Sequence, residues 1–179
     1  MKKLMIAAAI VCAAAFAQAA AVDWNASYVC KGGIPVTGTI AAMFAVEDVA
    51  IATLTEQFAK GDFSNWSKGI EHTTSGYGSI SMDTPYKGDK TAGTYNFYTV
   101  FLDADSTANA KNFFVYAGAN GTGIEKTLVE GEQTPVQFGN LYSASSAAGA
   151  WQAVAVPEPT SGLLLLLGVA GLALRRRRA

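Results

Sequence analysis

The chain has 179 residues and a formal net charge of −1, but this small value hides an uneven distribution of charge. Six of the 13 basic residues lie at the two ends, as Lys2, Lys3 and four C-terminal arginines, whereas only one of the 14 acidic residues, Glu158, does. The segment between the ends keeps seven basic and 13 acidic residues, a net charge of about −6, and no arginine. Because phosphate recognition relies on guanidinium groups and nucleic-acid binding on a basic face, we expect this segment to have no nucleic-acid partner.

The first 19 residues are typical of a secretory signal peptide. Two lysines precede an apolar run over 4–16, which is too short for a stable membrane span. Ala17 and Ala19 supply the small residues at the −3 and −1 positions of a signal-peptidase site, which predicts cleavage after Ala19. Cleavage after Ala21 is the alternative. The expected partners at this end are the Sec machinery and signal peptidase.

Residues 22–142 are predicted to form one β-rich domain, because runs of β-branched and aromatic residues alternate with clusters of turn-forming residues. The expected strands are Ser27–Lys31, Pro35–Phe44, Gly78–Met82, Thr94–Leu102, Asn112–Ala117, Ile124–Val129 and Pro135–Phe138. Residues 95–102 are apolar on both faces, which predicts a central strand. The alternation over 28–31 is typical of a half-exposed strand in which Tyr28 and Cys30 share one face.

One segment, Val46–Lys60, has the apolar spacing of a helix instead. Its apolar face is formed by Ala50, Ile51, Leu54 and Phe58. Acidic residues at 47 and 48 suit the first turn, and Lys60 followed by Gly61 suits the last turn and the stop. We expect this helix to pack on the sheet. The predicted fold is therefore mainly β, an antiparallel sandwich or rolled sheet with one amphipathic helix.

Few residues of this domain favour catalysis. Cys30 and His72 are its one cysteine and its one histidine, and nothing in the sequence places them together as a nucleophile and a base. Glu130 and Glu132 are adjacent surface acids, whereas glycosidase carboxylates are normally separated in sequence. Asp103 begins an Asp-rich segment that matches a calcium loop only at its start, and we interpret it as a turn that caps a strand. We expect no enzyme activity, no metal and no cofactor.

Aromatic residues in polar, Gly-rich segments are the candidates for ligand contact. They are Trp24, Trp66, Tyr77 and Tyr86. Rings at such positions can stack on the faces of sugars, since each has an apolar body and a polar tip. Trp66 and Tyr77 carry the hypothesis of glycan contact. The alternative is that each ring packs at the edge of the domain.

Small residues dominate Ser143–Ala155, which predicts a tether between the domain and the C-terminal end. Trp151 lies within it and could dock on the domain. Beyond the tether, Pro157 and Pro159 hold Glu158 in an extended conformation that suits the groove of a protease.

The apolar run 162–174 is followed directly by the arginine cluster Arg175, Arg176, Arg177 and Arg178. At about 1.5 Å per residue this run spans roughly 20 Å, which is short of a hydrocarbon core of ~30 Å. The arginines resist crossing the membrane and place the C-terminus on its cytoplasmic side. The sequence thus predicts a single transmembrane helix, with the β-rich domain outside the cytoplasm.

The order of Val156-Pro157-Glu158-Pro159, apolar run and arginine cluster resembles the PEP-CTERM sorting signal over residues 156–179. In that family the signal is processed by an exosortase in Gram-negative bacteria that make exopolysaccharide. The resemblance implies a transient inner-membrane intermediate and delivery to the cell surface or extracellular matrix. It leaves two classes of function, a structural or adhesive protein and a glycan-binding module, with exopolysaccharide as a possible partner and a secreted hydrolase as a third class.

Overall fold

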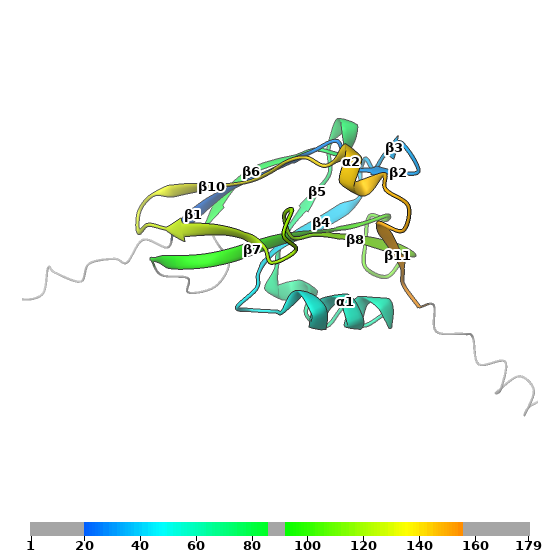
Figure 1. Ribbon diagram of the computed structural model, residues 1–179, viewed down its shortest axis with the longest axis horizontal. Helices are drawn as coiled ribbons and strands as arrows, with labels where there is room; N and C mark the ends of the chain where they lie inside the picture. The colour runs from blue at the N-terminus through cyan, green and yellow to red at the C-terminus, as the bar shows by residue number, and fades with distance from the viewer. Residues whose placement is uncertain (1–19, 86–91, 156–179) are drawn as a thin grey trace, which may run out of the picture.

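The computed structural model describes residues 20–85 and 92–155, which form three layers (Figure 1). A three-stranded sheet packs on a larger six-stranded sheet, and helix α1 (Ile51–Ala59) covers the other face of the larger sheet. The predicted signal peptide, Tyr86 and the predicted sorting signal with its transmembrane run lie outside the described residues. Within them, no helix is both long and apolar enough to cross a membrane.

The small sheet has the order β10 (Gln133–Asn140), β1 (Ala21–Ser27), β6 (Ile80–Pro85). Its central strand, β1, alternates between half-buried and buried positions, so that Val22, Trp24 and Ala26 point into the protein. Strand β1 is antiparallel to β6 and parallel to β10. Among the described strands this is the one parallel pair, and the rest of the expected antiparallel arrangement is confirmed.

The large sheet is built around its longest strand. Its members are β11 (Trp151–Ala153), β8 (Asn112–Tyr116), β7 (Gly93–Leu102), β4 (Ile40–Ala45), β5 (Ile70–Thr73) and β9 (Ile124–Leu128). Strand β7 pairs with β9 over 93–97 and with β8 over 99–102, while β4 lies on its other edge. Every residue of β7 from Phe97 onward is buried, which confirms the predicted central strand.

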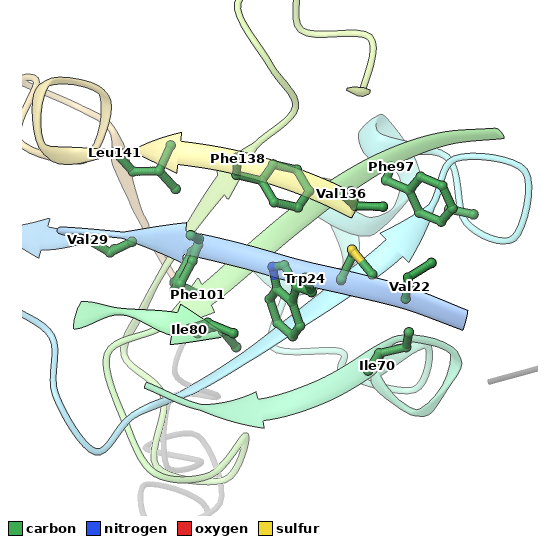
Figure 2. Packing of buried hydrophobic residues seen from close by; sticks show 14 of the residues in the cluster. Val22, Trp24, Val29, Ile70, Ile80, Phe97, Phe101, Val136, Phe138 and Leu141 are labelled. Atoms are coloured by element: carbon green, nitrogen blue, oxygen red, sulfur yellow. The ribbon is translucent and has the colours of Figure 1, made fainter. Parts of the chain in front are cut away.

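The main hydrophobic core lies between the two sheets (Figure 2). Trp24 of β1, Phe101 of β7 and Val136 of β10 are all fully buried there. Each large apolar side chain removed from water stabilises the fold by about 1.5–3 kcal/mol before the entropy of ordering is subtracted. The alternation of β1 and the double-sided burial of β7 therefore follow from one arrangement, a small sheet that covers one face of a large one.

A second core lies between the large sheet and α1. Phe44 and Tyr98 stack with their ring centroids 5.4 Å apart, and the hydroxyl of Tyr98 donates to the carbonyl oxygen of Val49 at 2.8 Å. Leu54 and Phe58, two of the four residues predicted for the apolar face of the helix, are fully buried. The expected packing of the helix on the sheet is thus confirmed.

The remaining elements are short. They are the hairpin of β2 (Cys30–Lys31) and β3 (Ile34–Pro35), the single-turn helices η1 (Trp66–Lys68) and η2 (Gly76–Gly78), and α2 (Tyr142–Ser145).

Helix α1 begins at Ile51, five residues later than the sequence predicts. The backbone N–H of Val46 instead donates a hydrogen bond of 2.8 Å to the carbonyl oxygen of Asn96, and the backbone N–H of Val49 donates one of 3.2 Å to the carbonyl oxygen of Ala45. Residues 46–49 therefore form a turn after β4. The acidic residues 47 and 48 consequently lie outside the first helical turn. The predicted stop is confirmed, since the chain leaves the helix at Gly61 with a φ of +76°.

The expected strand over 27–31 is wrong. Tyr28 has a φ of +56°, which breaks the chain between β1 and β2, and its side chain is exposed, whereas Cys30 is buried. The two residues therefore do not share a face. Strands β1 before Ser27 and β5 are absent from the sequence prediction, because short segments rich in polar and small residues carry a weak strand signal.

The expected tether over Ser143–Ala155 is also wrong, because these residues belong to the folded domain. They contain the end of α2 and the whole of β11, which pairs with β8. Ser145 is buried, and its hydroxyl oxygen accepts a hydrogen bond of 2.9 Å from the backbone N–H of Cys30. Small side chains here allow close packing, which composition alone does not distinguish from flexibility.

Candidate functional site

The C-terminal junction, which we define as residues 151–155, is the point where the folded domain meets the predicted sorting signal. Strand β11 pairs with β8, placing Trp151 opposite Phe114. Past the strand, the backbone N–H of Val154 donates a hydrogen bond of 2.9 Å to the carbonyl oxygen of Lys111. The backbone N–H of Ala155 donates one of 2.9 Å to the carbonyl oxygen of Ala59 in α1. The chain is therefore fixed up to the last described residue.

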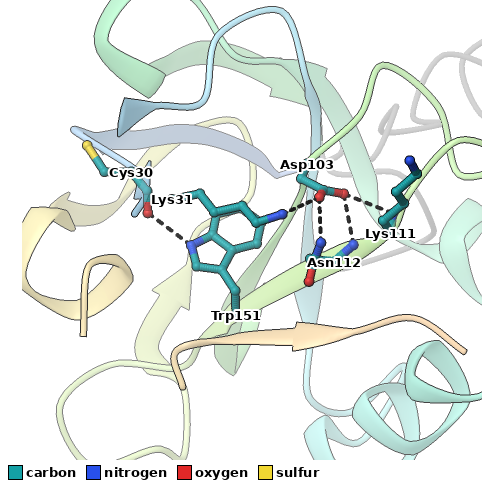
Figure 3. A network of polar contacts seen from close by, with 6 residues as sticks. All are labelled: Cys30, Lys31, Asp103, Lys111, Asn112 and Trp151. Atoms are coloured by element: carbon teal, nitrogen blue, oxygen red, sulfur yellow. Dashed lines mark hydrogen bonds and ion pairs between the residues drawn. The ribbon is translucent and has the colours of Figure 1, made fainter. Parts of the chain in front are cut away.

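Trp151 is the main anchor of this junction (Figure 3). Its indole N–H donates a hydrogen bond of 2.9 Å to the carbonyl oxygen of Cys30, and its ring packs against Phe114 with centroids 5.7 Å apart. The ammonium group of Lys31 lies 5.8 Å from the centroid of the indole. A cation over an indole face contributes about 0.5–1 kcal/mol at a partly exposed site.

The same ammonium group joins the junction to the loop after β7. Lys31 Nζ lies 2.5 Å from Asp103 Oδ2. The carboxylate of Asp103 also accepts hydrogen bonds from the backbone N–H of Lys111 and from the backbone N–H and side-chain amide of Asn112. Burial raises the pKa of Asp103, but these donors outweigh it and lower the pKa to about 2. The carboxylate is thus ionised and holds the 103–112 loop closed, as expected for an Asp-rich turn that caps a strand.

A half-open hollow of about 320 Å³ lies beside the end of the junction. It is lined by Gly61, Phe63, Thr107, Ala108, Ala110, Val154 and Ala155. All of these side chains are uncharged. The hollow therefore suits an uncharged or apolar group, and the chain leaves the described domain along its wall.

A second surface feature is an exposed aromatic pair, Tyr28 and Tyr77. Their ring centroids are 5.9 Å apart, and the exposed fractions of the two residues are 45% and 70%. Both have the backbone in the left-handed region, with φ of 56° and 61°, and they are the two non-glycine residues of the described chain that do so. For a bulky residue this conformation costs about 1–3 kcal/mol, which the surrounding structure must offset.

The backbone around the pair is tightly fixed. The N–H of Val29 donates to Gly78 at 3.2 Å, and a Cβ added to Gly78 would lie 2.2 Å from the carbonyl oxygen of Val29. Ser75 donates to the carbonyl oxygen of Ser79 through both its N–H and its hydroxyl, which closes the loop that carries Tyr77. The backbone segments that carry the two exposed rings are consequently fixed.

The other aromatic candidates lie inside the protein. Trp66 is only 8% exposed, packs against Phe44 and Phe58, and donates its indole N–H to Glu71. Trp24 is fully buried between the sheets. The expectation that Trp66 contacts glycans from the surface is therefore wrong, and Tyr77 is the one of the two candidates whose ring is accessible.

The candidates for catalysis, Cys30 and His72, do not form a hydrogen-bonded pair in the described structure. Within the described residues, no hydrogen bond joins Cys30 to His72, and burial raises the pKa of the Cys30 thiol, which disfavours the reactive thiolate. Glu130 and Glu132 are exposed at the turn between β9 and β10. No cluster of three potential metal ligands occurs in the part of the chain that the structure describes.

The fold and the junction define a β-rich domain whose last strand, β11, lies directly before the predicted sorting signal. Residues 155–178 match the sequence profile of the PEP-CTERM protein-sorting motif, which includes Val156–Pro159 and the four arginines. No curated protein and no solved structure matches the chain. The protein is thus an extracellular protein that is sorted by an exosortase and exported through a membrane-anchored intermediate. The signal-peptide residues Ala17 and Ala19 and the sorting residues from Val156 onward lie outside the described part.

Proposed function

We propose that the β-rich domain is a structural or adhesive protein of the cell surface or exopolysaccharide matrix of a Gram-negative bacterium, and that it is not an enzyme. The observation that carries this proposal is the direct connection between β11 and the sorting motif. Because the hydrogen bond from Ala155 to Ala59 fixes the last described residue, the folded domain itself is the cargo that the motif delivers. Its acidic surface suits a solvated protein outside the cell.

Fractionation of an exosortase-bearing host tests the location. We expect the processed protein in the surface or matrix fraction, and we expect the purified protein to self-associate in an ordered way at matrix concentrations. A processed protein that stays monomeric and is recovered only from the medium would contradict the structural or adhesive role.

A second candidate function, glycan binding, is favoured by Tyr28 and Tyr77. Two exposed rings on a fixed backbone form a platform on which the apolar faces of sugars can stack, and the phenolic hydroxyls can hydrogen-bond to sugar hydroxyls. Because the domain is acidic and lacks arginine, we expect a neutral polysaccharide rather than a polyanionic one.

Affinity electrophoresis in gels that contain a neutral glucan or galactomannan separates the two candidates. For a glycan-binding module, the wild-type protein is retarded, Tyr77→Phe retains most of the retardation and Tyr77→Ala loses it. Val129→Ala serves as the matched control, since Val129 is also exposed but lies far from the tyrosine pair. Strands β1 and β10 are parallel, and Val129 precedes the start of β10, whereas Tyr28 follows the end of β1, so the two residues lie toward opposite ends of the paired strands. Trp66 is unsuitable for this test because its replacement would disturb the core.

The same preparations test the absence of enzyme activity. Release of reducing ends from any of these polysaccharides by the wild-type protein would establish a secreted hydrolase and contradict the proposal.

A further inference from the structure

The surface around the end of the described chain has a fixed geometry. The backbone N–H of Ala155 donates a hydrogen bond to the carbonyl oxygen of Ala59, the last residue of α1. Gly61 makes room for Ala155, because a Cβ at Gly61 would lie 2.8 Å from the carbonyl oxygen of Ala155. The loop after β7 also lines the hollow, through Thr107 and Ala108. We call Gly61, Phe63, Thr107, Ala108 and Ala110 the exit surface.

The Val-Pro-Glu-Pro sequence of the sorting motif begins at Val156, directly after Ala155, which lines the same hollow as the exit surface. Glu158 is three positions after Ala155, and an extended chain covers at most about 3.3–3.6 Å per residue, so Glu158 lies within roughly 11 Å of Ala155. An enzyme that holds Glu158 and its flanking prolines in a groove must bring its own surface within that distance of the domain. With the tether absent, there is no spacer to keep the two proteins apart.

We infer that the exit surface is a contact surface for the exosortase while the sorting motif is being processed. Its side chains are small or apolar and uncharged, and the hollow of about 320 Å³ provides room for an apolar or uncharged group of the enzyme. The inference rests on the sorting motif and the junction. It depends neither on an adhesive role nor on glycan binding.

Photo-crosslinking in the full chain tests the contact directly. A crosslinking amino acid is placed at Ala108, which is exposed and follows the end of β7, and separately at Val129, which is also exposed. Val129 follows Leu128, which pairs with Gly93 at the start of β7, so the two positions lie toward opposite ends of that strand. The host carries a catalytically inactive exosortase so that the complex accumulates. We expect the yield of crosslinked exosortase at position 108 to exceed that at position 129 several-fold. Equal yields at the two positions would overturn the inference.

A flexible insertion tests the cause of the contact. Twelve Gly and Ser residues placed between Ala155 and Val156 should reduce the crosslink at position 108 to the level at position 129. A crosslink that survives the insertion undiminished would show that the short connection does not produce the contact, and the inference would fail.

Processing rates give an independent measurement in a host with active exosortase. Ala108→Glu should slow conversion of the full-length protein several-fold at the native spacing, the flexible insertion should restore it, and Val129→Glu should have no effect. If Ala108→Glu is processed like the wild type, the exit surface makes no contact that matters. A failure of the sorting motif itself is distinguishable, because it blocks processing with or without the insertion.

Discussion

The indole Nε1 of Trp151 donates a hydrogen bond of 2.9 Å to the carbonyl oxygen of Cys30, a residue 121 positions earlier in the chain. This contact joins β11, the last strand before the sorting motif, to the hairpin that follows β1. Because the two segments are so distant in sequence, this contact forms only when folding has brought them together. The sorting motif therefore follows a strand whose position depends on tertiary contacts.

Trp151→Ala should destabilise the processed protein by about 2–3 kcal/mol, since it removes the packing on Phe114 and leaves the carbonyl of Cys30 without this donor. Trp151→Phe keeps most of the packing and should cost about 1 kcal/mol. Urea denaturation followed by tryptophan fluorescence and circular dichroism measures both. An unchanged denaturation midpoint in Trp151→Ala would mean that β11 does not anchor the junction.

The lowered pKa of Asp103 leads us to expect that the folded protein loses stability in acid. Burial raises its pKa, but the hydrogen bonds from Lys31, Asn112 and Lys111 lower it from an ordinary 3.8 to about 2. Because the folded pKa lies below the unfolded one, the carboxylate contributes fully above about pH 4, and the contribution is lost as the pH falls through about 2. With solvent screening of the partly exposed pair, we expect about 1 kcal/mol.

The matched variant for this prediction is Asp103→Asn, which does not titrate. The difference in unfolding free energy between wild type and variant should be largest at neutral pH and shrink steadily between about pH 4 and pH 2. A difference that stays constant over this range would rule out the proposed role of the ionised carboxylate.

The left-handed backbone at Tyr77 leads us to expect that glycine is more stable than alanine at this position, which is the reverse of the order in a helix. At a φ of +61° a Cβ is strained, so Tyr77→Gly should be more stable than Tyr77→Ala by about 1 kcal/mol. Thr53 is the control, because it is exposed within α1, where glycine should be less stable than alanine by about 1 kcal/mol. Thermal unfolding of the four variants decides the matter, and the same preference at both positions would contradict the strain at Tyr77.

The start of β1 favours one of the two predicted signal-peptidase sites. Ala20 is buried in the main core, and the N–H of Ala21 donates to Glu132 at 3.2 Å. Cleavage after Ala19 retains both residues, whereas a chain that begins at Val22 should be less stable by about 1 kcal/mol. We expect N-terminal sequencing of the secreted protein to begin at Ala20. A protein that begins at Met1 would remove the signal-peptide prediction altogether.

The sorting motif predicts a trapped intermediate. Replacement of Pro157, Glu158 and Pro159 by alanine should leave export intact but keep the full-length protein in the inner membrane, because the processing site is gone while the apolar run remains. The neighbouring Thr160→Ala variant should be processed normally. Fractionation and intact mass distinguish these outcomes. Wild-type protein that persists at full length in the membrane of an exosortase-bearing host would make the tail an ordinary anchor.

The arginine cluster should act at a different step. Removal of Arg175–Arg178 should weaken orientation and retention in the membrane before processing, since these charges oppose passage of the C-terminus. Full-length protein found in the medium would be the expected sign. Accumulation in the membrane identical to that of the motif variant would contradict this assignment.

The sequence by itself determined the sorting signal, the central strand β7 and the helix α1. The sorting signal depends on the local order of prolines, apolar residues and arginines, and needs no tertiary contact. Strand β7 is apolar on both faces because both of its faces are covered, and α1 has the 3.6-residue period of a helix with one buried face. The signal peptide is read from the same kind of local pattern and stays a prediction.

Only the tertiary structure decided which aromatic rings are exposed and where the domain ends. Trp66 and Tyr77 both lie in polar, Gly-rich segments, but Trp66 fits between α1 and the large sheet, whereas Tyr77 is held outward by a left-handed backbone. The small residues of 143–155 have the composition of a tether, yet β8 offers them an unpaired edge and Cys30 offers Trp151 an acceptor. These contacts join residues far apart in sequence, and a local pattern carries no information about a partner that folding brings from elsewhere in the chain.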